Sequence, residues 1–470
     1  MNTVVRGAQL LVFKFFPIAW LALLFQAASA SDKPVKVFIL SGQSNMVGAG
    51  KVDGGSSRWG NQFIDPTVSV YKGDHDPQVD YDSMEPTKTL KLDAFGGVRP
   101  TPYPGGGTQV TRGFVQVKES GMYEFRPGYG GSTYNVMEVD GKVVHRQEVG
   151  EDAVRAEIKL QGGKKVPFKI TYFTKQANGL GWIVRLDVPG ALSTMVKFNG
   201  MYPYLIDENR QWAARDDVWY RGVVTAAGNR PLGVAGGRIG PEIGFGHVVG
   251  NHVDEPVLIL KTSQGNRSLS WDFLTPGSKQ FEYKGKIYAG YKESPLSWDK
   301  GTTPKPMNWY AGKQYDDCFG TAHEVLNNFD EQFPQWKGRG YEIVGFAWWQ
   351  GDKDRYNAGH ASRYEKNLVH LIKTLRKEFK APKAKFVVAT LGQTVKDSAE
   401  ENEKLILDAQ LAVAGTAGKY PEFKGNVATV YTHPLSQGGA SNSHYDGNAQ
   451  TYMDIGLAMG ESMVKLLEGK

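Results

Sequence analysis

A serine within a short glycine-bounded cluster is the strongest candidate nucleophile in this sequence. Ser44 lies in "GQSNM" (42–46), directly after the apolar run "VKVFIL" (35–40). Small residues here allow a tight strand-to-helix turn that exposes a hydroxyl, and backbone N–H groups at such a turn can stabilise an oxyanion. The cluster differs from the G-x-S-x-G elbow because Met46 replaces the second glycine. A serine that simply caps a helix is the commoner alternative.

A nucleophilic serine requires a general base, and His444 is the leading candidate. It lies in "SNSHYDGNAQTYMDIG", just before the last predicted helix, where a loop can reach the edge of a sheet. His433, at the end of a predicted strand, is the alternative. His247, His323 and His370 fall inside helical patterns, and we interpret them as structural.

Two carboxylates follow a predicted strand in "WWQGDKDR" (348–355). Asp352 and Asp354 stand beside Trp349 and Gln350, a combination typical of a site that holds a polar substrate. A solvated acidic turn is the alternative, although the adjacent tryptophans fit it poorly.

Two further segments offer groups that could stabilise an oxyanion. Gly240 precedes the helix-like run "PEIGFGHVVG", and its N–H could approach a ligand closely, although a plain helix start is the alternative. In "KTSQGNRSLSW" (261–271), the Asn266 side chain could donate an N–H to an oxyanion. Arg267 could contact a substrate or cap a loop.

Composition and motifs argue against several other functions. The net charge of +6 is mild and no basic cluster is present, so we predict no nucleic-acid partner. The single cysteine, Cys318, is predicted to be a packed thiol. "GDHDPQVDYD" (73–82) is rich in oxygen ligands but matches no EF-hand spacing, so a surface loop is favoured over a calcium site. No zinc, Walker A or dinucleotide motif is found, and we predict neither a metal nor a cofactor.

Strands and helices alternate along most of the chain, which predicts a doubly wound α/β sheet. Buried parallel strands are expected at 35–40, 256–261, 342–349, 385–391 and 426–433, and helices at 363–379, 398–415 and 449–469. Polar residues follow the strands, namely Ser44, Gln264, Asn266, Gln350, Asp352, Gln393 and His433. Ligands of open α/β sheets bind beyond the carboxyl ends of strands, so these side chains are expected to converge.

Two segments depart from this alternation. Residues 1–30 read as a cleavable export signal, with Arg6, an apolar region and a small-residue site ending at Ala30, and an uncleaved anchor is the alternative. Residues 68–190 contain alternating runs with a hairpin signal at Asp140-Gly141, which predicts an inserted β-sandwich. The main domain would then comprise 31–67 and 191–470, in a protein that is secreted or periplasmic.

Five ordered blocks resemble the SGNH-type carbohydrate esterases of the sialate O-acetylesterase and acetylxylan esterase group. They are "GQSNM", "IGPEIGFGHVVG", "GNRSLSW", "GFAWWQGDKD" and "HYDGNAQTYMDIG". The resemblance covers 32–67 and 191–470 and implies a flavodoxin-like three-layer α/β/α fold. It implies that Ser44 is the nucleophile and His444 the base. It also implies an oxyanion hole made by the Ser44 N–H, the Gly240 N–H and the Asn266 side chain.

One position departs from this family pattern. Many of these enzymes have Asp three residues before the histidine, where this chain has Ser441. We therefore expect Asp352 or Asp354 to orient His444, and a Ser–His dyad stays open. Substrate contacts are expected from the side chains Gln43, Gln264, Arg267, Trp349 and Gln350.

The sequence therefore predicts an exported serine esterase that removes acetyl groups from carbohydrate, either an acetylated polysaccharide or a sialic acid. A carbohydrate-binding protein with a decayed active site is the alternative from another class. A lipid or short-chain ester as substrate is a further alternative, disfavoured because no long apolar lid is found. The insert resembles a protective-antigen-type β-sandwich through "ESGMYEFRPGYGGSTYNVMEVDGKVV". It could bind carbohydrate or serve as a rigid structural insert.

Overall fold

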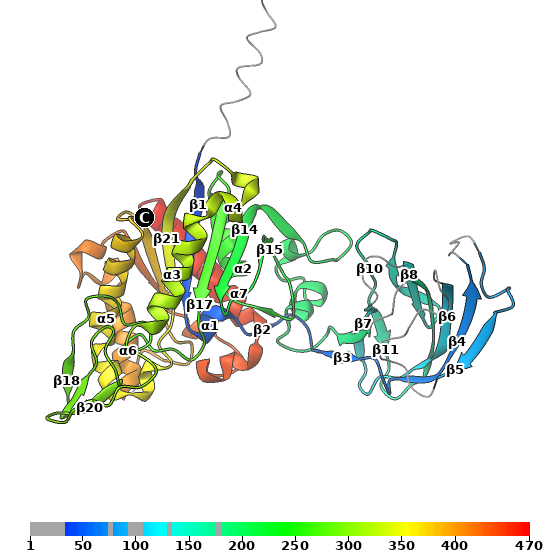
Figure 1. The fold of residues 1–470 in the computed structure, drawn as a ribbon, viewed down its shortest axis with the longest axis horizontal. Coiled ribbons are helices and arrows are strands. Elements are labelled where there is room, and N and C mark those ends of the chain that lie inside the picture. The colour runs from blue at the N-terminus through cyan, green and yellow to red at the C-terminus, as the bar shows by residue number, and fades with distance from the viewer. Residues whose placement is uncertain (1–32, 74–78, 93–106, 129–133, 175–180, 400) are drawn as a thin grey trace, which may run out of the picture.

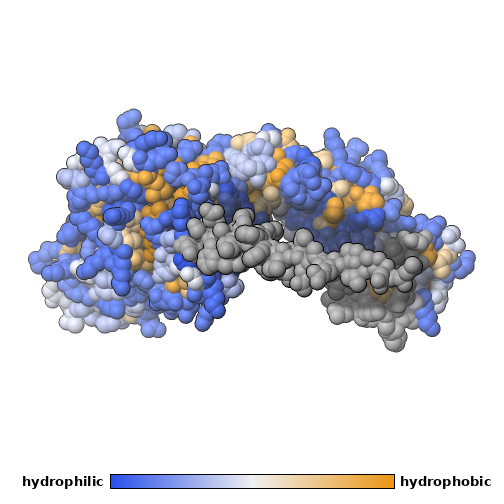
Figure 2. Space-filling model, turned by 90° about the horizontal axis from the view of Figure 1, so that it is seen from above, coloured by the Kyte–Doolittle hydropathy of each residue, from blue (hydrophilic) through white to orange (hydrophobic). Residues whose placement is uncertain are grey.

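The computed structural model describes residues 33–470 except 74–78, 93–106, 129–133, 175–180 and 400. The predicted export signal lies outside the described residues, as does part of the acidic segment 73–82. Within the described chain, none of the helices combines the length and the apolar character needed to cross a membrane. Figure 1 shows an α/β part beside a part built of strands, and Figure 2 shows that hydrophilic residues dominate the upper face of both.

The described α/β part is built on a seven-stranded sheet. Its order is β15 (Asn229–Gly233), β14 (Ala214–Val224), β17 (Val257–Ser263), β1 (Val35–Gly42), β21 (Tyr341–Trp349), β22 (Lys385–Ala389) and β23 (Val427–Val430). All neighbours are parallel except β14 and β15. The five predicted strands are confirmed and lie side by side. The sequence did not predict β14 or β15; in β14, "ARDDVWYRGVV" has three charged residues among its first four.

Helices cover both faces of this sheet because its central strand is apolar on both sides. Val37 and Ile39 of β1 belong to one core with side chains of α3 (Lys313–Asn327), α5 (Ala358–Glu378) and α6 (Glu401–Ala412). Phe38 and Leu40 belong to a second core with α2 (Glu242–His252) and α7 (Ala449–Leu467). The helices predicted at 363–379, 398–415 and 449–469 are therefore confirmed as α5, α6 and α7.

Cys318 lies in the first of these cores, as predicted for a packed thiol. Its side chain is fully buried, and burial raises the pKa of the thiol to about 11. A thiol that stays protonated at neutral pH is a poor nucleophile, so we assign Cys318 to packing alone.

The carboxyl ends of β17, β1 and β21 meet at the point where the chain order of the sheet reverses. From β1 the chain builds β14 and β17 on one side, and it then crosses to β21, β22 and β23 on the other. The Gln43 N–H donates to the Trp349 carbonyl (3.2 Å), and the Gln264 N–H donates to the Gly42 carbonyl (3.2 Å). Such a switch point is where open α/β sheets bind ligands.

The second part contains two antiparallel sheets in its described residues. One has the order β10 (Val154–Arg155), β9 (Lys142–Gln147), β8 (Tyr134–Val139), β12 (Val166–Thr174), β6 (Gly107–Val115), β4 (Phe63–Lys72) and β5 (Lys88–Lys91). The other has the order β11 (Ile158–Leu160), β7 (Gly121–Arg126), β13 (Trp182–Arg185) and β3 (Ser56–Arg58). Buried side chains from both sheets, including Phe125 and Phe168, form one core.

Two sequence predictions concern this second part. The hairpin at Asp140-Gly141 is confirmed, because Val139 pairs with Lys142 across a two-residue turn. The sheets take in β3 and β4, so the strand pairing begins at residue 56, whereas the predicted boundary was 68. Pro66 and a register shift between Ile64 and Thr67 interrupt the alternation of apolar and polar residues in β4. The sequence pattern therefore did not indicate the first half of this strand.

Short elements complete the described fold. The short strands are β2 (Gly50–Lys51) with β16 (Arg238–Ile239), and β18 (Phe281–Tyr283), β19 (Lys286–Tyr288) and β20 (Ser297–Asp299). The short helices are α1 (Ser44–Val47), α4 (Phe329–Gln332), the π-helix η2 (Thr194–Phe198) and the 3₁₀ helices η3 (Pro203–Leu205), η4 (Pro334–Trp336), η5 (Asp354–Tyr356), η6 (Gly415–Ala417), η7 (Pro421–Phe423), η8 (His433–Leu435) and η9 (Ser441–Gly447).

Candidate active site

Ser44 is the first residue of α1, directly after the turn that ends the central strand. Gly42 has a φ of +149°, and a Cβ built on it would lie 2.2 Å from the carbonyl oxygen of Trp349. Only glycine fits there. The N-cap of α1 is Gln43, no side chain caps the helix, and Ser44 is partly exposed. The hydroxyl is therefore presented by the turn and not used as a cap.

A glycine that the sequence analysis overlooked lies against this serine. A Cβ built on Gly265 would lie 3.6 Å from the Ser44 Cβ, so the backbone after β17 passes directly beside the candidate nucleophile. Asn266 follows with a φ of 55° and an exposed side chain. The signal in the sequence was a glycine two residues past the end of a strand, next to Gln264, which the sequence analysis had noted.

The structure argues against the predicted role of Gly240 in an oxyanion hole. The Gly240 N–H already donates to Oε1 of Glu242 (3.0 Å), and Gly240 is buried. The neighbour of Gly240 is the end of α1, because a Cβ built on Gly48 would lie 2.5 Å from the Gly240 Cα. Gly240 therefore packs against the end of α1, and its N–H is not free to bind a substrate.

A buried ion pair extends this support. The Lys261 ammonium lies 2.7 Å from Oε2 of Glu242 and donates to the Val47 carbonyl at 2.8 Å. The side chains are 2% and 9% exposed. Burial lowers the pKa of Lys261, and the Glu242 carboxylate opposes that change. The pair joins β17, the first turn of α2 and the last residue of α1.

His444 lies in a strained loop next to α1. His444, Tyr445 and Asp446 have φ values of 54°, 52° and 52° inside η9, which adjoins α1. Left-handed backbone costs roughly 1–2 kcal/mol per residue without glycine. The buried Tyr445 offsets this cost, since its ring stacks on Trp349 (5.9 Å between centroids) and its hydroxyl accepts from the Gly392 N–H (3.1 Å).

A second tyrosine links the histidine loop to the serine turn. The hydroxyl of Tyr452, on α7, lies 3.4 Å from Oδ1 of Asn45 and 3.3 Å from the His444 carbonyl. Among the described residues the structure gives no hydrogen bond between the Ser44 and His444 side chains, and both are partly exposed. Catalytic hydrogen bonds are often long before substrate binds, so this geometry is compatible with a base that closes on Ser44.

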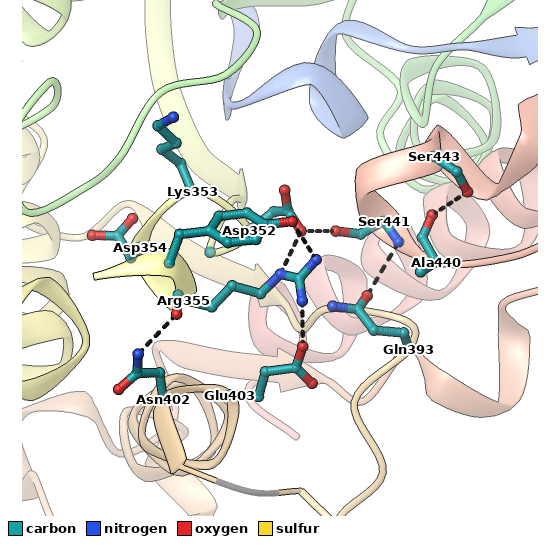
Figure 3. A network of polar contacts seen from close by, with 12 residues as sticks. Asp352, Lys353, Asp354, Arg355, Gln393, Asn402, Glu403, Ala440, Ser441 and Ser443 are labelled. Atoms are coloured by element: carbon teal, nitrogen blue, oxygen red, sulfur yellow. Dashed lines mark hydrogen bonds and ion pairs between the residues drawn. The ribbon is translucent and has the colours of Figure 1, made fainter. Parts of the chain in front are cut away.

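Asp352 reaches the position where the family pattern has an aspartate. Its Oδ1 accepts from the Ser441 hydroxyl (2.8 Å), and Ser441 lies three residues before the candidate base. Arg355 Nε donates to the same oxygen at 2.8 Å, and Arg355 also pairs with Glu403 (2.6 Å). Figure 3 shows Asp352 between Ser441 and Arg355. A carboxylate is thus delivered to the histidine loop from β21 and not from the loop itself.

Asp354 occupies a different environment. It is fully buried, and its carboxylate accepts from the N–H groups of Leu269 (2.8 Å) and Ser270 (2.9 Å) and from Gln350 Nε2 (2.7 Å). Burial raises the pKa of Asp354, and these hydrogen bonds oppose that change. Asp354 therefore fixes the segment after β17 against the segment after β21, and its oxygens point away from the histidine loop.

The structure argues against three of the predicted substrate contacts, because their side chains are enclosed by protein. Gln43, Trp349 and Gln350 are 2%, 0% and 0% exposed. Gln43 Oε1 accepts from the Gly351 N–H (3.1 Å), and Trp349 Nε1 donates to the Thr390 carbonyl (3.0 Å). Gln350 Nε2 donates to the Arg267 carbonyl (3.0 Å). These side chains tie the strand ends together, which the sequence could not distinguish from contacting a ligand.

Arg267 remains a candidate substrate contact. Its guanidinium lies 4.7 Å from the ring centroid of Trp309, and its Nε donates to Oε1 of Gln314 (3.2 Å). Both Arg267 and Trp309 are partly exposed. Arg267 lies two residues after Gly265, so this cation–aromatic pair stands close to the serine turn. The sequence analysis did not single out Trp309.

Four other histidines pack against or contact protein groups. His433, at the start of η8, has its Nδ1 2.8 Å from the Gly392 carbonyl, and we assign this histidine a structural role. His247 is buried on α2, and burial lowers its pKa to about 4. His323 stacks on Phe379, and His370 Nε2 lies 2.9 Å from the Pro276 carbonyl. In the described ranges, no group of three or more His, Cys, Asp or Glu side chains is arranged to hold a metal ion.

Comparison with known families agrees with the class that this geometry suggests. The model of the carbohydrate esterase, sialic acid-specific acetylesterase family matches residues 204–465, which is more than half of the chain. The chain belongs to this carbohydrate esterase family. No curated protein matches it.

Solved structures show only distant likeness. A protein from Arabidopsis thaliana is 15% identical, with 54% of this chain and 87% of that chain covered at a TM-score of 0.33. A carbohydrate acetylesterase from Xanthomonas citri is 11% identical, with 79% and 72% covered at a TM-score of 0.35. The PA14 domain of the antifreeze protein MpAFP is 11% identical, with 26% and 80% covered at a TM-score of 0.20. Likenesses with TM-scores below 0.5 do not bear on the activity of this chain.

Proposed function

We propose that this protein is an exported serine esterase that removes O-acetyl groups from carbohydrate. The observation that carries the proposal is the position of Ser44. It is presented on a glycine-dependent turn at the switch point of the sheet, and the histidine loop adjoins α1. Membership of the carbohydrate esterase family supports the substrate class.

The proposed reaction uses two steps at one serine. His444 accepts the Ser44 proton as Oγ attacks the acetyl carbonyl carbon, which gives a tetrahedral oxyanion. Collapse of this intermediate breaks the bond to the sugar oxygen, and that oxygen takes the proton from His444. Water then attacks the acetyl-serine, with His444 accepting and returning a proton, and acetate leaves. The Ser44 N–H and the Gly265 N–H are the proposed oxyanion donors, with the exposed Asn266 side chain as a third candidate.

We assign the role of the triad acid to Asp352. Its carboxylate accepts a hydrogen bond from Ser441, which lies three residues before His444 in the same loop. Asp354 is assigned a positioning role because its oxygens are used by Leu269 and Ser270.

Exchange of two residues tests this assignment. Asp352→Asn is expected to lower kcat by roughly 10⁴-fold, the scale on which neutralising the acid of a triad acts. In that background Ser441→Asp is expected to recover at least about tenfold of the lost kcat, because the carboxylate returns to the position three residues before the base. Initial rates on 4-nitrophenyl acetate provide the measurement. Full activity in Asp352→Asn would establish a dyad, and no recovery in the double variant would argue against delivery through position 441.

Other features of the proposal rest on the sequence. The α/β part is proposed to be a flavodoxin-like SGNH hydrolase domain, with the strands between residues 56 and 185 as an inserted β-sandwich. Residues 1–30 are proposed to be an export signal cut after Ala30, which places the mature protein in the periplasm or outside the cell. N-terminal sequencing of the protein recovered after export tests the cut site.

Acetate release from a panel of substrates tests the proposed activity. The wild-type protein is expected to release acetate from acetylated xylan or from O-acetylated sialic acid and to act more slowly on esters with longer acyl chains. Activity that rises with acyl length would favour a lipid or general esterase. Binding of these sugars without any acetate release would favour the alternative, a carbohydrate-binding protein with a decayed site.

A further inference from the structure

One face of α5 carries a row of basic side chains far from Ser44 in the sequence. Arg363, Lys366, His370 and Lys373 follow one another at intervals of three, four and three residues. In a helix of 3.6 residues per turn these intervals keep the side chains on a single stripe. The sequence analysis found no basic cluster because apolar, neutral and acidic residues, Glu365 among them, separate these positions along the chain.

This row lines a cavity outside the candidate active site. The cavity has a volume of about 540 Å³ and lies between α5 and the segment from Leu274 to Phe281. Lys279 lines it from that facing segment, and Leu274 and Ala289 add apolar surface. Neither aspartate nor glutamate is among the described residues that line it.

Three of the four lysine and arginine side chains that line the cavity have no carboxylate partner among the described residues. Lys373 pairs with Glu422 (2.7 Å), but the described residues provide no ion pair for Lys279, Arg363 or Lys366. The guanidinium of Arg363 lies 4.7 Å from the ring centroid of Phe281, and its Nε has no hydrogen-bond partner. Like charges three or four residues apart repel each other modestly on a helix, so an anion in the cavity would relieve the repulsion between Arg363 and Lys366.

We propose that this cavity binds a carboxylated oligosaccharide, as a site separate from the esterase centre. The row from Arg363 to Lys373 spans about 15 Å at the rise of an α-helix, which suits a chain with repeated charges better than a single anion. Carboxylates accept short, charge-assisted hydrogen bonds from arginine and lysine. The Arg363 guanidinium lies against the Phe281 ring, and Phe281 itself stacks on Tyr288 (4.9 Å between centroids), so these contacts hold the Arg363 charge at the cavity wall.

A carbohydrate is favoured over other polyanions because the chain belongs to a carbohydrate esterase family. The site requires no turnover by Ser44, so the inference goes beyond the proposed function. It can hold if the esterase assignment fails, and it can fail while the esterase assignment holds.

Isothermal titration of the purified protein with oligogalacturonate tests this inference. The wild-type protein is expected to bind oligogalacturonate, to bind a neutral xylo-oligosaccharide of equal length at least about tenfold more weakly, and to lose affinity as salt is added. Lys279→Glu/Lys366→Glu is expected to raise the Kd for oligogalacturonate at least about tenfold. The urea unfolding midpoint of this variant should equal that of wild type, which shows that it is folded, and its rate of 4-nitrophenyl acetate hydrolysis should be unchanged.

The matched control is Lys337→Glu/Lys465→Glu, which changes the net charge equally at two exposed lysines away from the cavity. It is expected to bind as wild type does. Three results would overturn the inference: no binding of oligogalacturonate, equal loss of affinity in the control, or tighter binding of a DNA duplex through the same lysines. The last result would assign the row of cations to nucleic acid.

Discussion

Ser44→Ala is expected to lower kcat for acetate release by at least about 10³-fold, the scale on which removal of a triad nucleophile acts. Alanine keeps the turn after β1, because the Ser44 hydroxyl does not cap α1. The change therefore removes the attacking oxygen and leaves the fold and the substrate contacts in place. Initial rates on 4-nitrophenyl acetate and acetylated xylan, with KM determined separately, provide the measurement.

A matched serine variant separates chemistry from folding in this experiment. Ser398→Ala changes an exposed serine outside the site and should keep wild-type kcat. Both variants should unfold at the wild-type midpoint. A Ser44→Ala protein that retains more than about a tenth of the wild-type kcat would remove Ser44 from the reaction.

Lys261→Met is expected to destabilise the protein by about 3–5 kcal/mol, the range seen when one member of a buried ion pair is removed. The loss arises because the Glu242 carboxylate stays buried without its cation and the Val47 carbonyl loses its donor. In Lys261→Met/Glu242→Gln the uncompensated charge is gone, and the glutamine can still accept from the Gly240 N–H. The double variant should therefore be more stable than the single one, and urea unfolding followed by circular dichroism measures both.

The Lys261–Glu242 pair also supports the helix that carries Ser44. We therefore expect the double variant to recover stability without recovering full activity. Val47 ends the helix that Ser44 begins, so loss of the Lys261 contact is expected to displace Ser44. A displacement of about 1 Å can lower a catalytic rate by 10²-fold. The double variant is therefore expected to have a kcat below that of wild type, although its stability recovers. A Lys261→Met protein within about 1 kcal/mol of wild type would show that water or another group satisfies Glu242.

The sequence predicted the centre of the fold because its strands are buried on both faces. Runs such as 35–40 and 385–391 are continuously apolar, which is typical of parallel strands covered by helices. Strand β14 was not predicted, because only its alternate residues face the core and its first half is charged. The start of the antiparallel sheets before residue 68 was not predicted, because Pro66 interrupts the alternation of apolar and polar residues that indicates a strand.

The sequence predicted where the candidate site lies in the fold. It predicted less well which side chains contact one another there. Ser44 and the histidine loop do adjoin at the edge of the sheet where strand order reverses. The burial of Trp349 was not predictable, because an aromatic residue at a strand end packs beneath a site as readily as it lines one. The bond between Ser441 and Asp352 joins residues 89 positions apart and depends on side-chain reach, which no local pattern encodes.

The most direct test of the account is to label the protein with a fluorophosphonate, which reacts with activated serines, and to map the modified residue by mass spectrometry. The account predicts one adduct per molecule on the peptide that contains Ser44, with loss of esterase activity in proportion to labelling. It also predicts that Ser44→Ala and His444→Ala take up no label. An adduct on another serine, or full esterase activity in a protein labelled stoichiometrically at Ser44, would contradict the central claim that Ser44 is the nucleophile.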